Sequence, residues 1–536
     1  MSAMEIRKLP IGIQDFETIR TDGYIYVDKT AYIYRLVTLG KPYFLSRPRR
    51  FGKSLLITTL EAYFLGKKEL FHGLEIEKYE TEWTAYPVLK FSLAGGEFTK
   101  EDGLASALRN WLLNFEQKYG LPSDEPTLPV RFQNALKNAY EKTGLRVVVL
   151  VDEYDNPLLK AFATDSKQEQ RNRELYKGFF AILKDCDTYL RFVLFTGVTK
   201  FSKVSIFSDL NQFQDISMHP QYAEICGITQ AELEANFSPE IDAMAEAHKM
   251  TREDCLAKLK QLYDGYRFCD GSKNIYNPFS IISAFSSLKF GKYWFSTGTP
   301  TFLVKRLNET GFDPKRFSDG SLYTTEDAIS DYRPDNPDIV PLLYQSGYLT
   351  LKGYDERRQR FTLGYPNDEV KYGFTASLAP VYLNNTKHST GTDIFAIDDA
   401  LEAGDTDTLR DQFTALFAHL PYTSGVPDAK KDAIIEQNFQ NVVYLVFLQL
   451  GQFVHVEQHS AKGRADCITE TDEYVYIFEF KRDISADNAL AQIDAQGYAK
   501  PYEADTRKLI KIGVCFSSEE KNITEWKIGT VATLTQ

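Results

Sequence analysis

The sequence predicts an α/β protein built from several domains, the first of which contains a parallel sheet. The chain has 536 residues, more than one hydrophobic core usually serves. Residues 1–235 alternate strand-like runs with helical stretches. The runs at 147–151 and 192–195 are apolar throughout, as in strands buried on both faces of a parallel sheet. A composition of 43% apolar and 25% charged residues excludes a largely disordered or fibrous chain.

The pattern changes along the chain and predicts four regions. Residues 236–300 have helical patterns, and residues 339–374 read as helix, strand, charged turn and strand, the order of a winged-helix module. A stretch rich in Thr, Asp and Gly near 385–430 precedes a renewed α/β pattern. Candidate strands of the first region lie at 43–45, 88–91, 147–151 and 192–195. The predicted regions are an N-terminal domain at 1–235, a helical and winged-helix-like region at 236–385, a linker at 386–429 and a C-terminal α/β domain at 430–536.

Charge and cysteine content limit the partners and the cellular compartment that we expect for the protein. The 62 basic and 74 acidic side chains give a formal net charge of −12, so the chain as a whole lacks a dominant basic footprint for nucleic acid. The six cysteines are scattered without short spacings, as expected of reduced thiols in a cytoplasmic protein. No secretory signal or membrane-length apolar run is visible, so we expect no membrane partner, while an oligomer is compatible with the sequence.

A phosphate-binding loop is predicted at residues 47–54. The apolar run 43–45 precedes RPRRFGKS, and an apolar helix follows. Strand, loop, Gly-Lys-Ser and helix is the context of a P-loop, in which backbone N–H groups and a helix N-terminus hold phosphate oxygens. Lys53 would reach the β and γ phosphates of ATP, and Ser54 would ligate Mg²⁺. The residues expected to bind ATP in this loop are Arg49, Arg50, Gly52, Lys53 and Ser54.

The loop departs from the GxxxxGK(S/T) pattern at one position. Arg47 stands where that pattern has glycine, so the first turn must be made in another way, for instance with Pro48 fixing φ. The alternative interpretation of the segment is an ordinary strand-to-helix turn with a surface lysine.

The predicted strand at 147–151 ends in two carboxylates. A buried acid at a strand end is costly unless a cation or hydrogen bonds compensate. Asp152 is placed to hold Mg²⁺, and Glu153 is placed to polarise the attacking water. The alternative is a strand that ends in a solvated acidic turn. Since a P-loop about 100 residues upstream predicts a strand of this form, the two motifs together favour nucleotide binding.

The strand at 192–195 leads into a polar tip. In ATPases of this layout the corresponding strand carries a hydroxyl or amide group that contacts the γ-phosphate. Thr196 or Thr199 would serve, and we include Thr199 in the predicted ATP site. Plain capping of the strand is the alternative role for both hydroxyls.

These segments resemble the AAA-ATPase-like family of bacteria. The matching segments are YVDKT at 26–30, RPRRFGKSL at 47–55, LVDEYDNP at 150–157, TGVTKFSKVSIFSDLN at 196–211, LYDGYRF at 262–268, YNPFSI at 276–281 and YWFSTGTPTFL at 293–303. The resemblance covers about residues 1–300 and implies a P-loop ATPase core. Arg47 belongs to the usual motif of that family, so the missing glycine does not argue against the resemblance.

A cluster of acidic side chains is predicted after residue 430. Glu436 lies on a helix, Asp466 on a strand and Glu479 on the next strand, and the hairpin turn expected at 469–473 would set the two strand residues side by side. Residues i and i+2 of a strand share a face, so Glu479 and Lys481 point together. The three carboxylates would hold Mg²⁺ or Mn²⁺, and Lys481 would orient water or stabilise charge. The alternative is an exposed hairpin with a cross-strand charge pair.

This arrangement resembles the PD-(D/E)xK nuclease superfamily. Asp466, Glu479 and Lys481 match its core motif, and Glu436 and Gln492 match flanking helix positions. The resemblance implies a restriction-endonuclease-like α/β domain in which the three core residues are catalytic. Ala465 replaces the proline of the motif name, a position that varies widely in the superfamily.

Taken together, the motifs predict a P-loop protein that binds and hydrolyses ATP, coupled to a Mg²⁺-dependent phosphodiesterase acting on DNA or RNA. One alternative is a nucleotide-dependent switch or scaffold whose nuclease-like domain binds a partner without cutting. Another is an ATPase with a purely structural C-terminal tail. Intact acid and lysine sets at both predicted sites favour the coupled enzyme.

Overall fold

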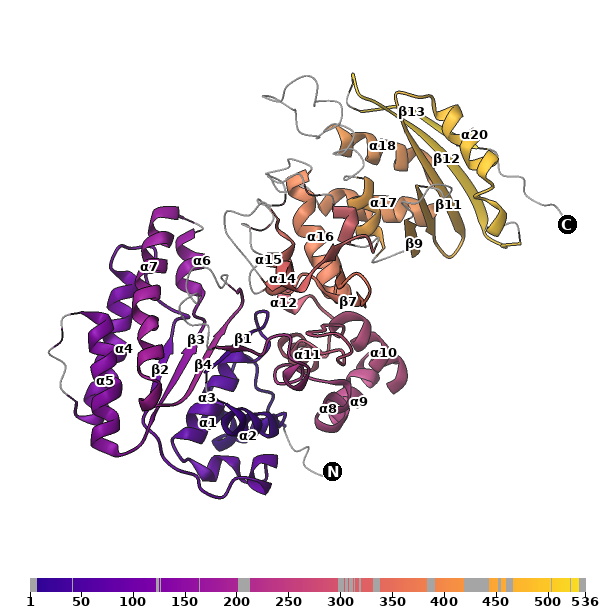
Figure 1. Cartoon of the computed structure of the whole chain (residues 1–536). Coiled ribbons are helices and arrows are strands. Elements are labelled where there is room, and N and C mark those ends of the chain that lie inside the picture. Colours follow the sequence, from indigo (N-terminus) through magenta and orange to yellow (C-terminus); the bar gives the residue numbers. More distant parts are fainter. Residues whose placement is uncertain are drawn as a thin grey trace. The chain divides into compact units, whose positions relative to one another are not determined.

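The computed structural model divides the chain into two units (Figure 1). The first unit comprises Met1–Thr297 and Tyr323–Val370, and the second comprises Gly298–Leu322 and Lys371–Gln536. The structure describes residues 7–40, 42–121, 125, 127–162, 164–200, 213–296, 303, 307, 312, 314–317, 320–330, 338–382, 391–418, 443–451, 455–458, 466–502, 504–520 and 522–529.

The first unit is built on a five-stranded parallel sheet, which confirms the predicted N-terminal architecture. Its strands are β1 (Pro42–Ser46), β2 (Val88–Ser92), β3 (Val147–Asp152), β4 (Leu190–Gly197) and β5 (Gln214–Asp215). The order across the sheet is β2-β3-β4-β1-β5. β4 therefore lies between β1, which leads into the loop 47–54, and β3, which ends in the predicted carboxylates. Because all pairs are parallel, the carboxyl ends of these strands meet at one edge.

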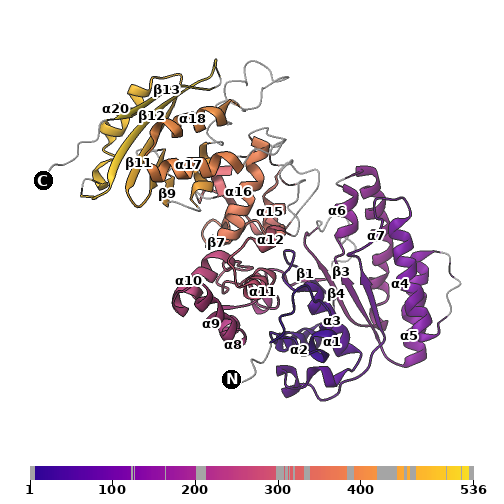
Figure 2. The same cartoon turned by 180° about the vertical axis from the view of Figure 1, so that it is seen from behind.

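Helices cover both faces of this sheet (Figures 1 and 2). α3 packs on β2 and β3 from one side, while α4 contacts β2 and α5 contacts β3. The helices around the sheet are α1 (Phe16–Thr21), α2 (Thr30–Leu39), α3 (Lys53–Phe64), α4 (Gly103–Tyr119), α5 (Leu128–Thr143), α6 (Asn156–Phe162) and α7 (Ser166–Asp185). β3 is buried at every position, as its continuous apolar sequence predicts.

The middle of the chain is helical and ends in a small antiparallel sheet. The helices are α8 (Gln230–Asn236), α9 (Ser238–Ala247), α10 (Arg252–Tyr263), α11 (Pro278–Ser287), α12 (Tyr293–Ser296), α14 (Glu326–Ser330) and α15 (Val340–Ser346). The strands β6 (Tyr323–Thr324), β7 (Thr350–Asp355) and β8 (Arg360–Gly364) pair in the order β6-β8-β7. The predicted order of helix, strand, charged turn and strand is confirmed by α15, β7 and β8. Gly347, with φ of 92°, ends α15.

The second unit contains a five-stranded mixed sheet in the order β13-β12-β11-β10-β9. Among its described strands, β11 and β12 pair in parallel and the other neighbouring pairs are antiparallel. The sheet's strands and adjoining helix are β9 (His455–Gln458), β10 (Cys467–Glu470), β11 (Tyr474–Arg482), β12 (Lys508–Ser517), β13 (Asn522–Gly529) and α20 (Ala486–Gln496). α20 contacts β11, β12 and β13. Residues 443–450 are also helical, and α16 (Asp368–Tyr382) enters this unit at Lys371.

The linker expected over 386–429 is wrong in part, because two helices lie there. They are α17 (Gly391–Ala403) and α18 (Thr406–Phe417). The Asp and Thr residues that suggested a loop cap a helix instead: the Asp405 side chain accepts a hydrogen bond from the Thr408 backbone N–H. Leu401 and Phe413 are fully buried, so these helices belong to the packed unit.

Within the described part of the chain, no helix is long and apolar enough to cross a lipid bilayer.

Candidate nucleotide and metal sites

The loop predicted to bind phosphate joins β1 to α3. Its first residue still belongs to the ladder of the sheet, since the Arg47 backbone N–H donates to the Gly197 carbonyl of β4 at 3.1 Å. Arg50 and Gly52 have left-handed backbone angles, with φ of 69° and 91°. Glycine adopts this conformation without cost and other residues do not, so the strain at Arg50 marks a loop held in a defined path by its surroundings.

Arg47 occupies the position at which the usual pattern has glycine, and its side chain is held inside the protein. Its side chain is 1% exposed. The guanidinium donates to the carbonyl oxygens of Ser46 at 2.9 Å, Ser217 at 2.7 Å and Tyr222 at 3.0 Å. It also lies 4.0 Å from the centre of the Phe268 ring. Arg47 is thus a structural residue that ties the loop to the segment after β5, a role that the sequence pattern alone did not reveal.

Lys53 is folded onto its own loop. Its ammonium group donates to the Arg47 carbonyl at 2.9 Å and the Pro48 carbonyl at 3.0 Å. Burial lowers the pKa of Lys53, and nearby carboxylates, Asp152 foremost, oppose that shift. The lysine charge is therefore held in place by carbonyl oxygens beside an acidic strand end. Phosphate oxygens can replace carbonyl oxygens as acceptors at the same ammonium group.

The two carboxylates after β3 have different surroundings. Asp152 is buried, and its Oδ1 accepts a hydrogen bond from the Thr196 hydroxyl of β4 at 2.6 Å. Glu153 has a left-handed φ of 53° and is half-buried. Burial and the Asp152 charge raise the pKa of Glu153, while Lys53 opposes them. A carboxylate whose pKa is raised accepts protons more readily, as a general base requires.

Asp155 is a site residue that sequence reasoning missed. Its Oδ2 accepts hydrogen bonds from the backbone N–H groups of Val198 and Thr199, at 3.0 and 2.6 Å, and from the Thr199 hydroxyl at 2.7 Å. A Cβ atom on Gly197 would meet Oδ1 of Asp155 at 2.7 Å, so this approach requires glycine. Thr199, predicted to contact ATP, is engaged with Asp155 in this arrangement. The second acid of the EYDNP segment was the signal for it.

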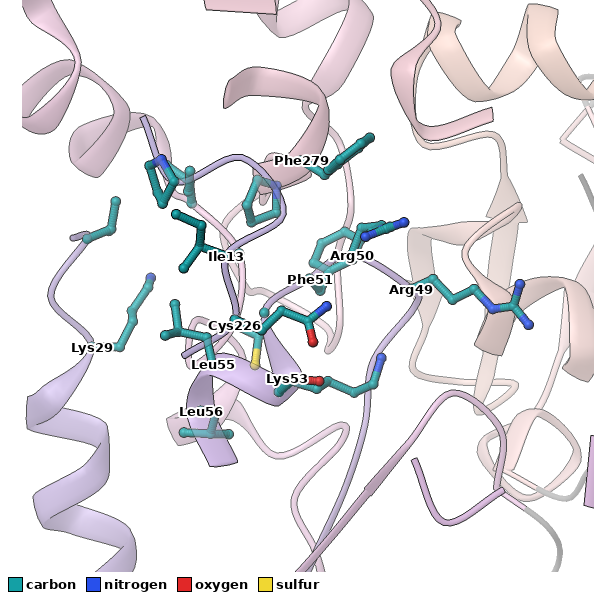
Figure 3. Close-up of a pocket in the computed structure, with 18 of the residues that line it drawn as sticks. Ile13, Lys29, Arg49, Arg50, Phe51, Lys53, Leu55, Leu56, Cys226 and Phe279 are labelled. Carbon is teal, nitrogen blue, oxygen red and sulfur yellow. The ribbon is translucent and has the colours of Figure 1, made fainter. Parts of the chain in front are cut away.

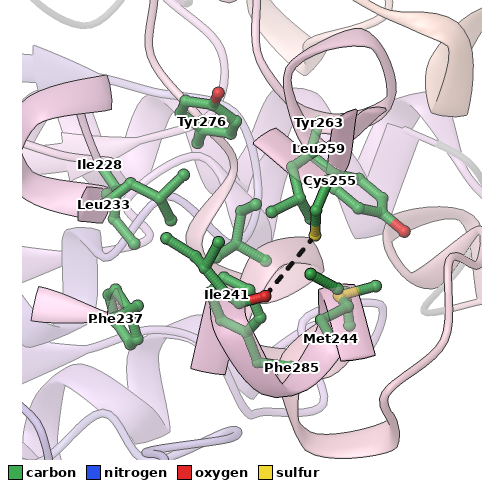
Figure 4. Packing of buried hydrophobic residues seen from close by; sticks show 13 residues of the cluster. Ile228, Leu233, Phe237, Ile241, Met244, Cys255, Leu259, Tyr263, Tyr276 and Phe285 are labelled. Carbon is green, nitrogen blue, oxygen red and sulfur yellow. Dashed lines mark hydrogen bonds between the residues drawn. The ribbon is translucent and has the colours of Figure 1, made fainter. Parts of the chain in front are cut away.

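A cavity of about 450 Å³ opens beside the loop (Figure 3). Arg49, Arg50, Gly52, Lys53 and Ser54 all line it, as do Glu153 and Asp155. Its other wall is apolar and includes Ile13, Ile25, Val27, Ile228, Phe237, Phe279 and Ile282. Ile228 and Phe237 also belong to the buried cluster that α8–α11 form (Figure 4). The cavity therefore combines a cationic loop with an apolar wall, the pairing that phosphates and a flat base require.

The second candidate site lies on the β10–β11 hairpin. Cys467 pairs with Phe478 across the antiparallel strands, which places Asp466 near Glu479. The backbone N–H of Phe480 donates to Asp466 Oδ2 at 2.8 Å. Lys481 donates to Glu479 Oε1 at 2.8 Å, so these two side chains share one face of β11.

Glu479 is buried with one oxygen unsatisfied. The side chain is 1% exposed, and within the described residues Oε2 has no hydrogen-bond partner. Burial and the neighbouring Asp466 raise the pKa of Glu479, while Lys481 opposes them. A buried carboxylate oxygen without a donor is costly, and a hard cation such as Mg²⁺ is the partner that carboxylates commonly take. The donor set thus fits a divalent cation held by Asp466 and Glu479.

Two further residues, Glu436 and Gln492, were predicted for this site. Glu436 lies outside the described residues. Gln492, on α20, makes a long hydrogen bond of 3.5 Å to the Tyr498 hydroxyl. No group of three or more His, Cys, Asp or Glu side chains suited to a metal occurs within the residues that the structure describes.

Comparisons with known proteins match two segments of the chain to two families. Residues 10–207 match the family described as "Predicted AAA-ATPase", and residues 434–526 match the "PD-(D/E)XK nuclease superfamily". A protein of Azotobacter chroococcum mcd 1, described as an uncharacterized protein in the vnfD 5' region, is 36% identical over 533 residues. That match covers 97% of this chain and 98% of the relative.

Proposed function

This chain belongs to the predicted AAA-ATPase-like family and ends in a PD-(D/E)XK nuclease superfamily domain, and from that premise we propose that it binds and hydrolyses ATP and couples this to Mg²⁺-dependent cleavage of DNA or RNA. The observation that carries the proposal is the convergence of Lys53, the acidic end of β3 and the tip of β4 beside one cavity.

At the first site, the loop 47–54 would hold the phosphates of ATP. Lys53 would exchange the carbonyl oxygens of Arg47 and Pro48 for phosphate oxygens. Ser54 and Asp152 supply the hydroxyl and carboxylate oxygens that Mg²⁺ prefers, and the cation would neutralise charge on the phosphates. Glu153 would accept a proton from the attacking water. Thr196 donates a hydrogen bond to Asp152 and would thereby link the end of β4 to this site.

At the second site, Asp466 and Glu479 would hold Mg²⁺ or Mn²⁺, which would polarise the scissile phosphate and activate water. The geometry supports two protein oxygens for the cation: the unsatisfied Glu479 Oε2 and the Asp466 carboxylate. Lys481 would stabilise the negative charge that builds up on the phosphate, since it already sits against Glu479. Glu436 and Gln492 would complete the site as predicted from their family positions.

The first test is ATP hydrolysis by the purified full chain with Mg²⁺, comparing wild type with Lys53→Ala. We expect the variant to lose at least about 100-fold in hydrolysis, because a buried phosphate-binding cation disappears. Lys67→Ala, a lysine on the surface after α3, is a matched control and should hydrolyse ATP normally. Unchanged hydrolysis in Lys53→Ala would reject the ATP site.

The second test separates an enzyme from a binding module. Labelled single- and double-stranded DNA and RNA are incubated with Mg²⁺ or Mn²⁺ and either wild type or Asp466→Ala. Cleavage by wild type alone supports the nuclease. If wild type and Asp466→Ala both bind nucleic acid and neither cleaves it, the alternative is favoured. That alternative is a nucleotide-dependent switch or scaffold that holds a partner.

A further inference from the structure

Arg49 and Arg50 are neighbours in the loop but lie in different surroundings. Both are exposed, and both line the cavity. Within the described part of the chain, neither guanidinium makes an ion pair with a carboxylate. Two unpaired arginines at a cavity with a phosphate-binding loop are sites for an anion, since arginine binds phosphate through several N–H groups at once.

Arg50 belongs to the apolar side of the cavity. Its guanidinium lies 4.8 Å from the centre of the Phe279 ring, on the first turn of α11. Phe279 and Ile282 of that helix line the cavity. Figure 3 shows Arg50 beside Phe279. The charge of Arg50 is thus held next to the wall on which a nucleotide base would lie.

Arg49 belongs to the carboxylate side. Its backbone carbonyl accepts a hydrogen bond from the Trp294 indole N–H at 3.3 Å, and Trp294 packs edge-to-face on Tyr348 at 5.1 Å. Its side chain extends away from Phe279 (Figure 3). Glu153, the carboxylate that would activate water, lines the same cavity as Arg49. Arg49 and the reacting carboxylate therefore border one space, while Arg50 lies against Phe279.

We propose that the two arginines divide the work: Arg49 stabilises the γ-phosphate during hydrolysis, and Arg50 contributes to nucleotide binding from the Phe279 side. This rests on the proposed ATPase function. In the reaction the water oxygen bonds to the γ-phosphorus and the bond from that phosphorus to the bridging oxygen breaks. Glu153 takes the proton of the water and later releases it to solvent, leaving ADP and phosphate. Arg49 acts on the charge that develops on the transferred group and is a catalytic residue in this scheme.

The test measures binding and turnover separately in the full chain. Arg49→Ala, Arg49→Lys and Arg50→Ala are compared by titration with a fluorescent ATP analogue and by steady-state hydrolysis of ATP. We expect Arg49→Ala to lower kcat about 100-fold or more with Kd changed less than about threefold. Arg50→Ala should raise Kd about tenfold with kcat nearly unchanged, since it removes an interaction common to ground and transition states. Arg171→Ala, an exposed arginine on α7, is the control and should match wild type.

Arg49→Lys keeps the charge but loses the planar guanidinium, so its kcat should lie between those of wild type and Arg49→Ala. Equal losses of affinity in Arg49→Ala and Arg50→Ala, with kcat intact, would overturn the division. If wild type binds no ATP, the proposed function fails as well. If wild type binds and hydrolyses ATP but Arg49→Ala has normal kcat, only this inference fails.

Discussion

The two candidate sites differ in how completely their charges are satisfied before any ligand binds. In the first unit, Lys53 has two carbonyl acceptors and Asp155 has three donors. In the second unit, Glu479 keeps a buried oxygen that has no partner among the described residues. The groups of the first site are held by hydrogen bonds within the protein, whereas at the second site Lys481 pairs with one oxygen of Glu479 and the other oxygen has no donor among the described residues. A charge held by exchangeable partners suits reversible nucleotide binding, whereas an unsatisfied acid suits a cation.

The largest effect should come from removing that unsatisfied acid. We expect Glu479→Gln to reduce cleavage of DNA or RNA about 1,000-fold while ATP hydrolysis stays normal, because the cation loses one of its two described carboxylates. The assay compares product formation on gels for both proteins under the same Mg²⁺ concentration. Glu473→Gln, an exposed glutamate of the same hairpin, is the matched control and should cleave normally.

Glu479→Gln should also change stability in a way that distinguishes the sites. Because the folded pKa of Glu479 is raised, its stabilising effect is full below the ordinary glutamate pKa and is lost as pH rises through the folded pKa. Above that pH range, Mg²⁺ should restore the stability of the wild-type protein. The stability of Glu479→Gln should not depend on Mg²⁺. Equal Mg²⁺ stabilisation of both proteins would place the cation elsewhere.

The two sites also differ in how much of each could be predicted from the sequence. The loop predicted to bind phosphate is contiguous, so its eight residues were enough to predict the strand before it and the helix after it. The role of Arg47 could not be predicted, because its carbonyl acceptors at Ser217 and Tyr222 lie about 170 residues away and meet it only through the order of the sheet. The role of Asp155 could not be predicted either, because its hydrogen-bond donors belong to Val198 and Thr199 at the tip of β4.

The second site depends on strand register, which the sequence predicted through its hairpin turn. Asp466 and Glu479 come together as expected. The buried state of Glu479, with one oxygen lacking a donor, was not predictable, since it depends on how α20 and the sheet pack together. The linker expected at 386–429 was wrong in part, where α17 and α18 lie, because Asp and Thr occur both in loops and at helix caps and pattern alone does not separate the two.

The next effect concerns the residue that replaces glycine in the first site. Arg47→Met leaves buried carbonyls without a donor, so we expect about 3 kcal/mol of destabilisation in the first unit. Arg507→Met in the second unit removes partly exposed ion pairs with Glu470 and Asp505 and should cost less, about 1 kcal/mol. Hydrogen exchange measured for each strand gives the stability of each unit separately. It does not assume that the whole chain unfolds at once. Amides of β1 should exchange about 100-fold faster in Arg47→Met, and β11 should not change; equal effects in both units would show that the loop is not held by Arg47.

The smallest effect compares Glu479 with a buried glutamate whose oxygens are both satisfied. Glu369 accepts hydrogen bonds from the Ser280 hydroxyl and the Trp294 backbone N–H, each at 2.7 Å. Burial raises the pKa of Glu369 to about 7. A raised pKa means that its stabilisation is complete below the ordinary value and is lost as pH rises toward 7, so the first unit should lose about 2 kcal/mol between pH 5 and 7.

Glutamine has no charge, and it can accept from the Trp294 N–H through its oxygen while its NH2 group donates to the Ser280 hydroxyl oxygen. Glu369→Gln should therefore flatten this pH dependence. Protection of α11 against hydrogen exchange, corrected for the intrinsic pH effect, measures the slope at pH 5, 6 and 7 for both proteins. Mg²⁺ should not alter it in either, because neither oxygen of Glu369 lacks a partner, whereas Mg²⁺ should offset the pH effect at Glu479. A slope that disappears with Mg²⁺ in wild type would mean that burial alone, rather than an unsatisfied oxygen, is enough to recruit a cation, and the distinction between the two sites would no longer hold.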